Sequence, residues 1–189
     1  MNDICCIGHI TRDKIITPHH EAFISGGTAF YFSYAIARLP RKVSYQLVTK
    51  LGRYDVEEVK RMRAERIDVL AYTCDNSVYF ENRYEGDQNK RTQRVLSKCE
   101  PFKISEMNGV EAKVFHLGSL LNDDFSADFV RELSTRGRIS IDAQGFLREV
   151  HGQKVVAVDW EEKHKILKHT HTLKLNEHEM EVLTGLTNP

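Results

Sequence analysis

The chain lacks long apolar runs and any excess of charge of one sign. Its apolar segments are far shorter than the roughly 20 residues that span a bilayer, and its start, Met1-Asn2-Asp3, lacks the basic and apolar parts of a signal peptide. Lysine plus arginine and aspartate plus glutamate number 27 each among the 189 residues, so no net field attracts nucleic acid or an acidic membrane surface. We therefore expect a cytoplasmic protein that binds neither nucleic acid nor membrane.

Common cofactor and metal motifs are also missing. The sequence contains neither Gly-x-x-x-x-Gly-Lys-Ser/Thr nor Gly-x-Gly-x-x-Gly, so neither a P-loop nor a Rossmann fingerprint supplies a nucleotide site. The four cysteines have no zinc spacing, and the adjacent Cys5 and Cys6 in an apolar segment are interpreted as reduced, buried side chains. The dense histidines between 164 and 178 do not share one helical face, which favours surface imidazoles over a metal site.

Apolar strand patterns alternate with helical patterns along most of the chain. Strands are predicted over 4–7, 43–48, 69–72, 114–117, 139–141 and 172–175, and helices over 28–39, 56–66, 126–135 and 160–168. Such alternation predicts an α/β fold, Rossmann-like and doubly wound, with a mostly parallel sheet and helices on both faces. The helix over 28–39 is apolar nearly all round, so we expect something besides the sheet to cover it.

Two segments, about 13–24 and 76–97, alternate in polarity and break this rhythm. They predict a small β-sheet lid, with a turn-rich tip over 85–89 in the second segment. The alternative is a surface hairpin that only protects a sheet edge. The basic residues over 90–94 lie near Glu81 and are interpreted as part of a solvated hairpin tip.

Polar residues gather at the start of the last predicted helix. A strand over 171–175 is followed by Asn176, and a helix over 177–183 ends at Gly185. Asn176 and Glu179 have the spacing of a capping box, in which each side chain bonds the other's backbone N–H. The alternative is a metal or phosphate site, because open α/β folds bind ligands at the carboxyl ends of their strands.

A second group of residues lies near the start of the chain. Gly26 and Gly27 precede the apolar helix and let a ligand approach bare backbone N–H groups. Asp13 follows Gly8, the end of the first predicted strand, by five residues. Its carboxylate is either a ligand-binding group or a turn aspartate that bonds its own backbone.

In combination, these pieces resemble the ribokinase-like sugar kinases, also called the phosphofructokinase B family. The matching pieces, in the family's order, are 8–13, Gly26-Gly27, 50–55, 141–148 and 175–179. The resemblance covers essentially all of the chain. It implies one ribokinase-like domain over 1–189, incomplete at its C-terminus, with the lid segments given above.

The resemblance also implies roles for individual residues. Asp13, Gly26 and Gly27 would hold the acceptor's hydroxyls, and Tyr31 would contact its ring or belong to the core. Asp142 and Arg148 would lie near the reacting end, or form a surface salt bridge, and Asn176 and Glu179 would organise magnesium and phosphate. Thr11, Thr28 and Tyr31 stand where ribokinases carry other residues, so ribose is not specified as the acceptor.

The implied activity is ATP-dependent phosphotransfer to a hydroxyl of a sugar or polyol, with Mg²⁺ as cofactor. The lid would close over the sugar and often pairs with a second subunit, which implies a homodimer. Two alternatives stay open: a non-catalytic carbohydrate-binding relative, and a nucleoside or other small-molecule kinase.

The family's Gly-Ala-Gly-Asp element, which carries the catalytic base, does not occur in residues 1–189. We therefore expect the base to lie beyond Pro189 and no catalytic residue within the sequence given. The resemblance then implies that these residues are the substrate-binding portion of a kinase and are inactive alone.

Overall fold

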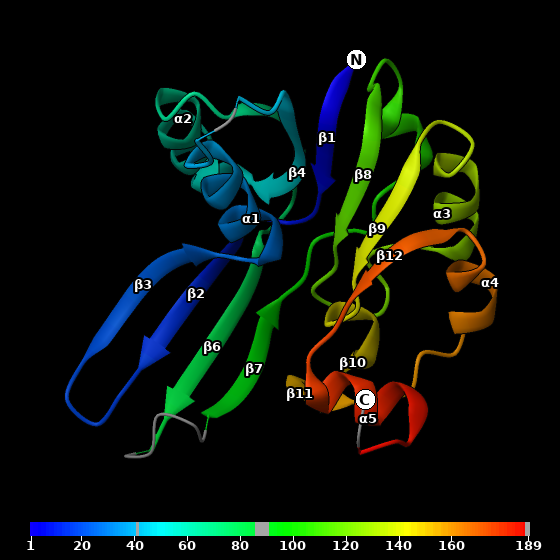
Figure 1. Ribbon diagram of the computed structural model, residues 1–189. Helices are drawn as coiled ribbons and strands as arrows, with labels where there is room; N and C mark the ends of the chain where they lie inside the picture. The colour runs from blue at the N-terminus through cyan, green and yellow to red at the C-terminus, as the bar shows by residue number, and fades with distance from the viewer. Residues whose placement is uncertain (41, 86–90, 188–189) are drawn as a thin grey trace.

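A computed structural model describes residues 1–40, 42–85 and 91–187, which form two six-stranded sheets (Figure 1). All neighbouring strands of the first sheet are parallel. In spatial order this sheet contains β12 (Thr170–Lys174), β9 (Arg138–Asp142), β8 (Ala112–Gly118), β1 (Asn2–Ile7), β4 (Tyr45–Gly52) and β5 (Asp68–Cys74). The strand order runs outward in both directions from β1 and β8, which makes the gap between them a topological switch point.

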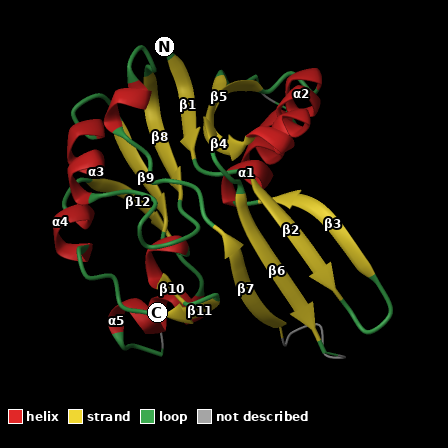
Figure 2. Cartoon of the chain, turned by 180° about the vertical axis from the view of Figure 1, so that it is seen from behind, coloured by secondary structure: helices red, strands yellow, loops and turns green. Residues whose placement is uncertain are grey.

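Helices cover both faces of the parallel sheet, as Figure 2 shows. The helices are α1 (Thr28–Ala37) and α2 (Val56–Ala64) on one face, and α3 (Ala127–Leu133) and α4 (Lys163–Leu167) on the other. Adjacent residues of β1 point to opposite faces, so Cys6 joins the core beneath α1 and α2 while Cys5 joins the core beneath α3. Both cysteines are free and buried. Among the described residues, no helix is long and apolar enough to cross a membrane.

The second sheet, which we call the lid sheet, is mixed. Its spatial order is β10 (Arg148–His151), β11 (Lys154–Ala157), β7 (Arg91–Ser97), β6 (Val78–Tyr84), β2 (Thr11–Ile16) and β3 (Glu21–Gly26). Strands β2 and β6 pair in parallel and the remaining pairs are antiparallel. Phe80 and Val95 on its inner face pack against Leu120 and Leu121, which follow β8 of the parallel sheet. The two sheets therefore share a hydrophobic cluster.

The predicted fold class is confirmed, and the elements fall close to their predicted positions. Helix α5 (Glu177–Thr184) ends at Gly185 in the left-handed conformation, with φ 74°. Short 3-10 helices were not predicted: η1 (Arg53–Asp55), η2 (Ile104–Met107) and η3 (Gly145–Leu147). Helix α1 is less covered than its composition indicates, because only Ala29 and Ser33 are buried and Tyr31 is 56% exposed.

Two sequence predictions concern positions outside the described residues. The tip of the lid hairpin falls largely on 86–89, which the structure does not describe. Pro189, beyond which the catalytic base is expected, also lies outside the described ranges, which end at 187. The position of the base and the incomplete C-terminus of the domain therefore stay predictions of the sequence.

Candidate functional site

The switch point brings the start of α1 against the ends of β1 and β8. A Cβ added at Gly8 would lie 2.7 Å from the carbonyl oxygen of Gly118 and 2.8 Å from Cβ of Ala29. A Cβ added at Gly118 would lie 3.2 Å from the backbone N of Ala29. The two glycines therefore allow the helix start to approach the strand ends closely, where open α/β folds place their ligands.

Asp13 lies within strand β2 of the lid sheet rather than in a turn. The hydroxyl of Thr11 donates a hydrogen bond to its Oδ1 at 2.7 Å. A Cβ added at Gly26 would come within 2.7 Å of its Oδ2, so the missing side chain at Gly26 makes room for the carboxylate. Burial raises the pKa of Asp13, while the Thr11 hydrogen bond and the charge of Arg91 oppose this rise. Asp13 is thus a half-buried carboxylate beside the helix start.

Gly27 is the N-cap residue of α1 and has φ 98°, a conformation that favours glycine. A Cβ there would lie 2.5 Å from the carbonyl oxygen of His9. No side chain caps the helix at this position. Each glycine of the predicted pair is therefore required for a different reason. Gly26 leaves room for the side chain of Asp13, and Gly27 adopts a backbone conformation that other residues disfavour.

Tyr31 and Asp142 line a cavity of about 590 Å³ between α1 and the exposed part of the parallel sheet. Asp142, at the end of β9, is 6% exposed and pairs with Nζ of Lys174 at 3.2 Å. Its Oδ1 also accepts a hydrogen bond from the backbone N of Gln144. In the same cavity His116 stacks on Phe32, with ring centroids 4.3 Å apart. Asp142 is therefore engaged by protein groups, and Tyr31 is a surface residue rather than a core residue.

A larger cavity of about 960 Å³ lies between the lid sheet and the start of α5. Its polar lining is mainly basic. The ionisable side chains around it are Arg91, Arg94, Arg148, His151, Lys154, His178 and Glu179. A cavity with this lining favours an anionic ligand, because arginine and lysine pair well with phosphate oxygens.

Arg148 is half-buried at the start of β10, beside this cavity. Its pKa lies below the ordinary value because of burial and the nearby charge of Arg91, while Glu179 and Asp142 act in the opposite direction. No carboxylate forms an ion pair with Arg148 within 1–40, 42–85 and 91–187, whereas Asp142 pairs with the exposed Lys174. The alternative of a surface salt bridge therefore holds for Asp142 and not for Arg148. A cation of this kind is suited to an external anion.

Asn176 and Glu179 form a complete capping box at the start of α5. The backbone N of Glu179 donates to Oδ1 of Asn176 at 2.8 Å, and the backbone N of Asn176 donates to Oε2 of Glu179 at 2.9 Å. In addition, Nδ2 of Asn176 donates to Oε1 of Glu179 at 3.0 Å. Glu179 is 7% exposed, yet both residues line the basic cavity. The capping interpretation is confirmed, and the position also suits a cavity ligand.

Arg91 is exposed, in agreement with the predicted solvated hairpin tip. It also lines the basic cavity, which the sequence does not predict, and its charge acts on both Asp13 and Arg148. Arg94 also agrees with the solvated interpretation. Its half-exposed side chain forms an ion pair with Glu81, with N and O atoms 3.2 Å apart. Residue 90 of the same patch lies outside the described residues.

A buried polar pair on the inner face of the lid sheet was also missed. Nε2 of Gln93 donates to Oδ1 of Asn82 at 2.8 Å, and Asn82 is only 3% exposed. Asn82 lies opposite Ile15 of β2, two positions beyond Asp13, so both polar side chains point to the same face as Asp13. The alternation of polarity in 76–97 could have indicated the face but not the partner strand.

Comparison with solved structures finds kinases of the ribokinase family. A pyrophosphate-dependent kinase of that family, solved with sulfate, is 29% identical, with a TM-score of 0.90 over 98% of this chain and 66% of that chain. A pyrophosphate-dependent myo-inositol-1 kinase is 26% identical, with a TM-score of 0.87 over 98% of this chain and 63% of that chain. A nucleoside kinase of Burkholderia thailandensis, in complex with inosine, is 16% identical, with a TM-score of 0.71 over 97% and 64%.

The resemblance to ribokinase-like kinases is thereby confirmed, and the chain has the ribokinase fold. Comparison with models of protein families gives no match, and neither does comparison with curated proteins. The chain spans slightly less than two thirds of the length of the pyrophosphate-dependent kinases that it matches.

Proposed function

We propose that the protein is a kinase that transfers a phosphoryl group from a polyphosphate donor to a hydroxyl of a small polyol or sugar. The observation that carries the proposal is that one lid sheet holds both the half-buried carboxylate of Asp13, on β2, and the strand β7, which lines the basic cavity around Arg148. Phosphoryl transfer needs an acceptor held next to a site that neutralises phosphate charge. We assign none of the described residues to the role of the base that accepts the hydroxyl proton, in keeping with the expectation that it lies beyond Pro189.

The acceptor is assigned to the Asp13 side of the site. Thr11 bonds Oδ1 of Asp13, and Oδ2 of the same carboxylate can accept hydrogen bonds from neighbouring hydroxyls of a ring. A polyol is favoured over a nucleoside because the solved kinases at 26–29% identity include one that acts on myo-inositol, whereas the nucleoside kinase at 16% shares only the fold.

The pair of Asn82 and Gln93 is assigned to the choice of hydroxyl. In the myo-inositol kinase, replacing an asparagine and a serine eleven positions apart by leucine converts a 1-kinase into a 3-kinase. Here an asparagine and a glutamine lie eleven positions apart and face each other on neighbouring lid strands. We expect the double substitution of both by leucine to move phosphorylation to another hydroxyl, as read from the product by NMR. The matched control is Glu81→Gln on the adjacent position of β6, which points to the opposite face.

The donor is assigned to the basic cavity. Pyrophosphate is our first choice because the more similar kinases use it, and ATP, which the sequence predicts, presents the same chain of phosphates. Asn176 and Glu179 fit a magnesium ion held through water, since their oxygens are hard ligands at the cavity wall but are already engaged in the capping box. Magnesium, when bound, neutralises charge on the donor phosphates. The homodimer and the cytoplasmic location stay predictions of the sequence.

The test uses the full-length protein with Mg²⁺, either pyrophosphate or ATP, and a panel of polyols, sugars and nucleosides. Product is detected by ³¹P NMR, and acceptor binding is measured separately by calorimetry. We expect a phosphorylated polyol with at least one donor. Binding of a polyol without product from either donor would favour the non-catalytic binding module, and faster phosphorylation of nucleosides would favour the nucleoside kinase.

A further inference from the structure

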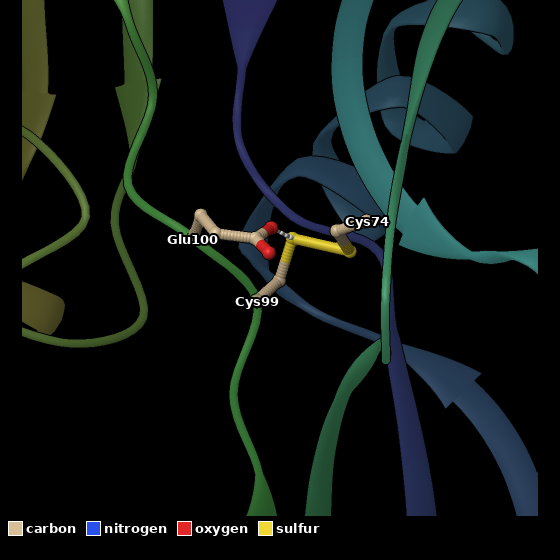
Figure 3. A group of neighbouring side chains, drawn as sticks. All are labelled: Cys74, Cys99 and Glu100. Atoms are coloured by element: carbon tan, nitrogen blue, oxygen red, sulfur yellow. Dashed lines mark hydrogen bonds between the residues drawn. A yellow bond between two sulfur atoms is a disulfide. The ribbon is translucent and has the colours of Figure 1, made fainter.

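Two cysteines stand at the base of the lid hairpin formed by β6 and β7. Cys74 is the last residue of β5, and Cys99 follows the end of β7 by two residues. Their sulfur atoms are bonded to each other (Figure 3). Their Cα atoms are 6.0 Å apart, within the range of roughly 4.4–6.8 Å that disulfides span. The described strands between the two cysteines are β6 and β7, so the bond encloses the hairpin.

The bond lies where the chain passes between the two sheets. One crossing leads from β5 into β6, and the other leads from β7 to the loop before η2. The crossings are also joined by a hydrogen bond from the hydroxyl of Ser97 to the carbonyl oxygen of Ser77, at 2.7 Å. Ser77 is in turn held by the backbone N of Gly52 in the parallel sheet, at 2.8 Å. The base of the hairpin is therefore a junction, and a covalent link there limits how far β6 and β7 can separate from the parallel sheet.

We propose that Cys74 and Cys99 form a reversible redox site that clamps the lid sheet to the parallel sheet. The partner is a disulfide of a small molecule or a protein. On oxidation, the two thiols lose two protons and two electrons in all, the Cys74–Cys99 bond forms, and the partner disulfide is reduced to two thiols. The reverse exchange, driven by a thiol reductant, opens the clamp.

The position of the pair suits a reversible link better than an inert one. Cys74 and Cys99 are 6% and 7% exposed, so the sulfurs are shielded but not sealed in the core as Cys5 and Cys6 are, at 0%. The carboxylate of Glu100 points at the pair, with Oε2 3.6 Å from Sγ of Cys99. A negative charge at this distance from the sulfur repels an attacking thiolate, so it slows closure of the bond.

A metal ion is the competing occupant of the reduced pair. The two sulfurs and a carboxylate oxygen of Glu100 lie within 4.8 Å of one another. Structural zinc sites almost always have four protein ligands, whereas this group offers three, one of them on an exposed residue. We therefore assign the two cysteines to a disulfide rather than to a metal site.

The experiment requires no enzymatic activity and is independent of the proposed function. The full-length protein is prepared oxidised and reduced without metal, alkylated under denaturing conditions, and analysed by mass spectrometry. Hydrogen exchange is then followed for β6, β7 and the segments at the hairpin base. We expect Cys74 and Cys99 to resist alkylation until reductant is added, and reduction to speed exchange in these segments by about tenfold or more, with β8 and β9 unchanged.

Variants separate the clamp from a general loss of stability. Cys74→Ser and Cys99→Ser should each exchange like the reduced protein and lose all response to reductant. Glu100→Gln, which keeps the shape of the side chain, should close the bond several-fold faster after reductant is removed. Alkylation of both cysteines without reductant, equal exchange in the oxidised and reduced proteins, or a zinc ion that protects the reduced pair would each overturn the proposal.

Discussion

At the scale of single residues, the site keeps two charges in places that disfavour them. Burial raises the pKa of Asp13 and contributes most to lowering the pKa of Arg148, so the charged form of each side chain is less favourable in the folded protein than in water. Neither effect helps folding at neutral pH. Charges held at such a cost are typical of binding sites, where a ligand supplies the missing interactions.

Asp13→Asn should separate binding from stability. The pKa of Asp13 is raised on folding, so its contribution to stability is present below its ordinary pKa of 3.8 and is lost as the pH rises through the higher folded value. At neutral pH the asparagine variant should therefore melt at the same or a higher temperature. Its affinity for the polyol should fall by roughly 10- to 100-fold, since a charged hydrogen bond is worth about 1.5–3 kcal/mol.

Asp3→Asn is the matched control for this measurement by calorimetry and thermal melts. The hydrogen bond from Lys113 lowers the pKa of the exposed Asp3, so this variant should lose stability at neutral pH and leave polyol affinity unchanged. An Asp13→Asn variant that binds the polyol as tightly as the wild type would return Asp13 to a structural role.

His116 should make the protein sensitive to acid. Burial lowers its pKa from 6.5 to about 4, so its contribution to stability is present above pH 6.5 and is lost as the pH falls towards 4. The full contribution is on the order of 3 kcal/mol. His116→Gln should flatten the fall in unfolding free energy between about pH 6.5 and about pH 4.5, measured by urea denaturation. His9, whose pKa is also lowered by burial, adds to this slope, whereas Asp13 and Asp124, whose pKa values are raised by burial, oppose it. Identical slopes in variant and wild type would refute the assignment to His116.

The candidate residues predicted from the sequence are close to one another in the chain. Asp13 and Gly26 lie on the paired strands β2 and β3, at the end away from the turn that joins them, and Gly27 follows directly. Arg91 and Asn82 depend on which strands pair and in which register, which a single sequence does not specify. The positions of Arg91 and Asn82 relative to Asp13 follow only from the observed strand pairing of the lid sheet.

At the scale of elements, the two residues of the capping box at the start of α5 also line the basic cavity. The strand before it and the glycine after it were predictable because both follow local rules of turn and cap geometry. The β10 and β11 hairpin was not predicted. Its strands are four residues each, too short for a periodic pattern, and the left-handed Gly152 between them is the only clear signal.

Glu179→Gln tests the two roles of this helix start. Because Nδ2 of Asn176 donates to Oε1 of Glu179, an amide at 179 would set two donor groups against each other and cost about 1 kcal/mol even in a purely structural role. A magnesium role adds a second effect, a much larger magnesium requirement for phosphotransfer. Magnesium titrations and thermal melts of the full-length protein measure both.

Glu177→Gln is the matched control for this substitution, because Glu177 is an exposed acid in the same first turn. It should cost a few tenths of a kcal/mol through the helix dipole and leave the magnesium requirement unchanged. If the magnesium curves of Glu179→Gln and the wild type superimpose, Glu179 is only a cap.

At the scale of the whole molecule, the sequence predicted the parallel sheet because strands and helices alternate along it. It did not predict how the two sheets meet, because the contacts of Phe80 and Val95 with Leu120 and Leu121, and the Cys74–Cys99 bond, join segments far apart in the chain. The charge of the protein likewise has one part that the sequence gives directly and one part that depends on folding. The net charge of zero is a property of composition, whereas the basic cavity exists only after folding.

This local charge predicts a difference between the two substrates in their response to salt. Four arginine or lysine side chains and one carboxylate line the cavity, so pyrophosphate binding should weaken as salt screens them, although the chain as a whole is neutral. Between about 0.1 M and about 1 M salt the screening length falls from about 10 Å to about 3 Å, and the Kd for pyrophosphate should rise by about tenfold or more. The Kd for myo-inositol, which is uncharged, should change by less than about twofold.

Calorimetry on the full-length protein measures both constants, and two arginine variants locate the effect. Arg148→Gln should weaken pyrophosphate binding and reduce its dependence on salt, because it removes a half-buried cation of the cavity wall. Arg12→Gln should change neither, because Arg12 lies over the rings of Phe23 and Tyr79 on the outer face of the lid sheet. Equal salt dependence for pyrophosphate and myo-inositol would mean that the donor does not bind among these arginines, and the phosphate site would have to be sought elsewhere in the full-length protein.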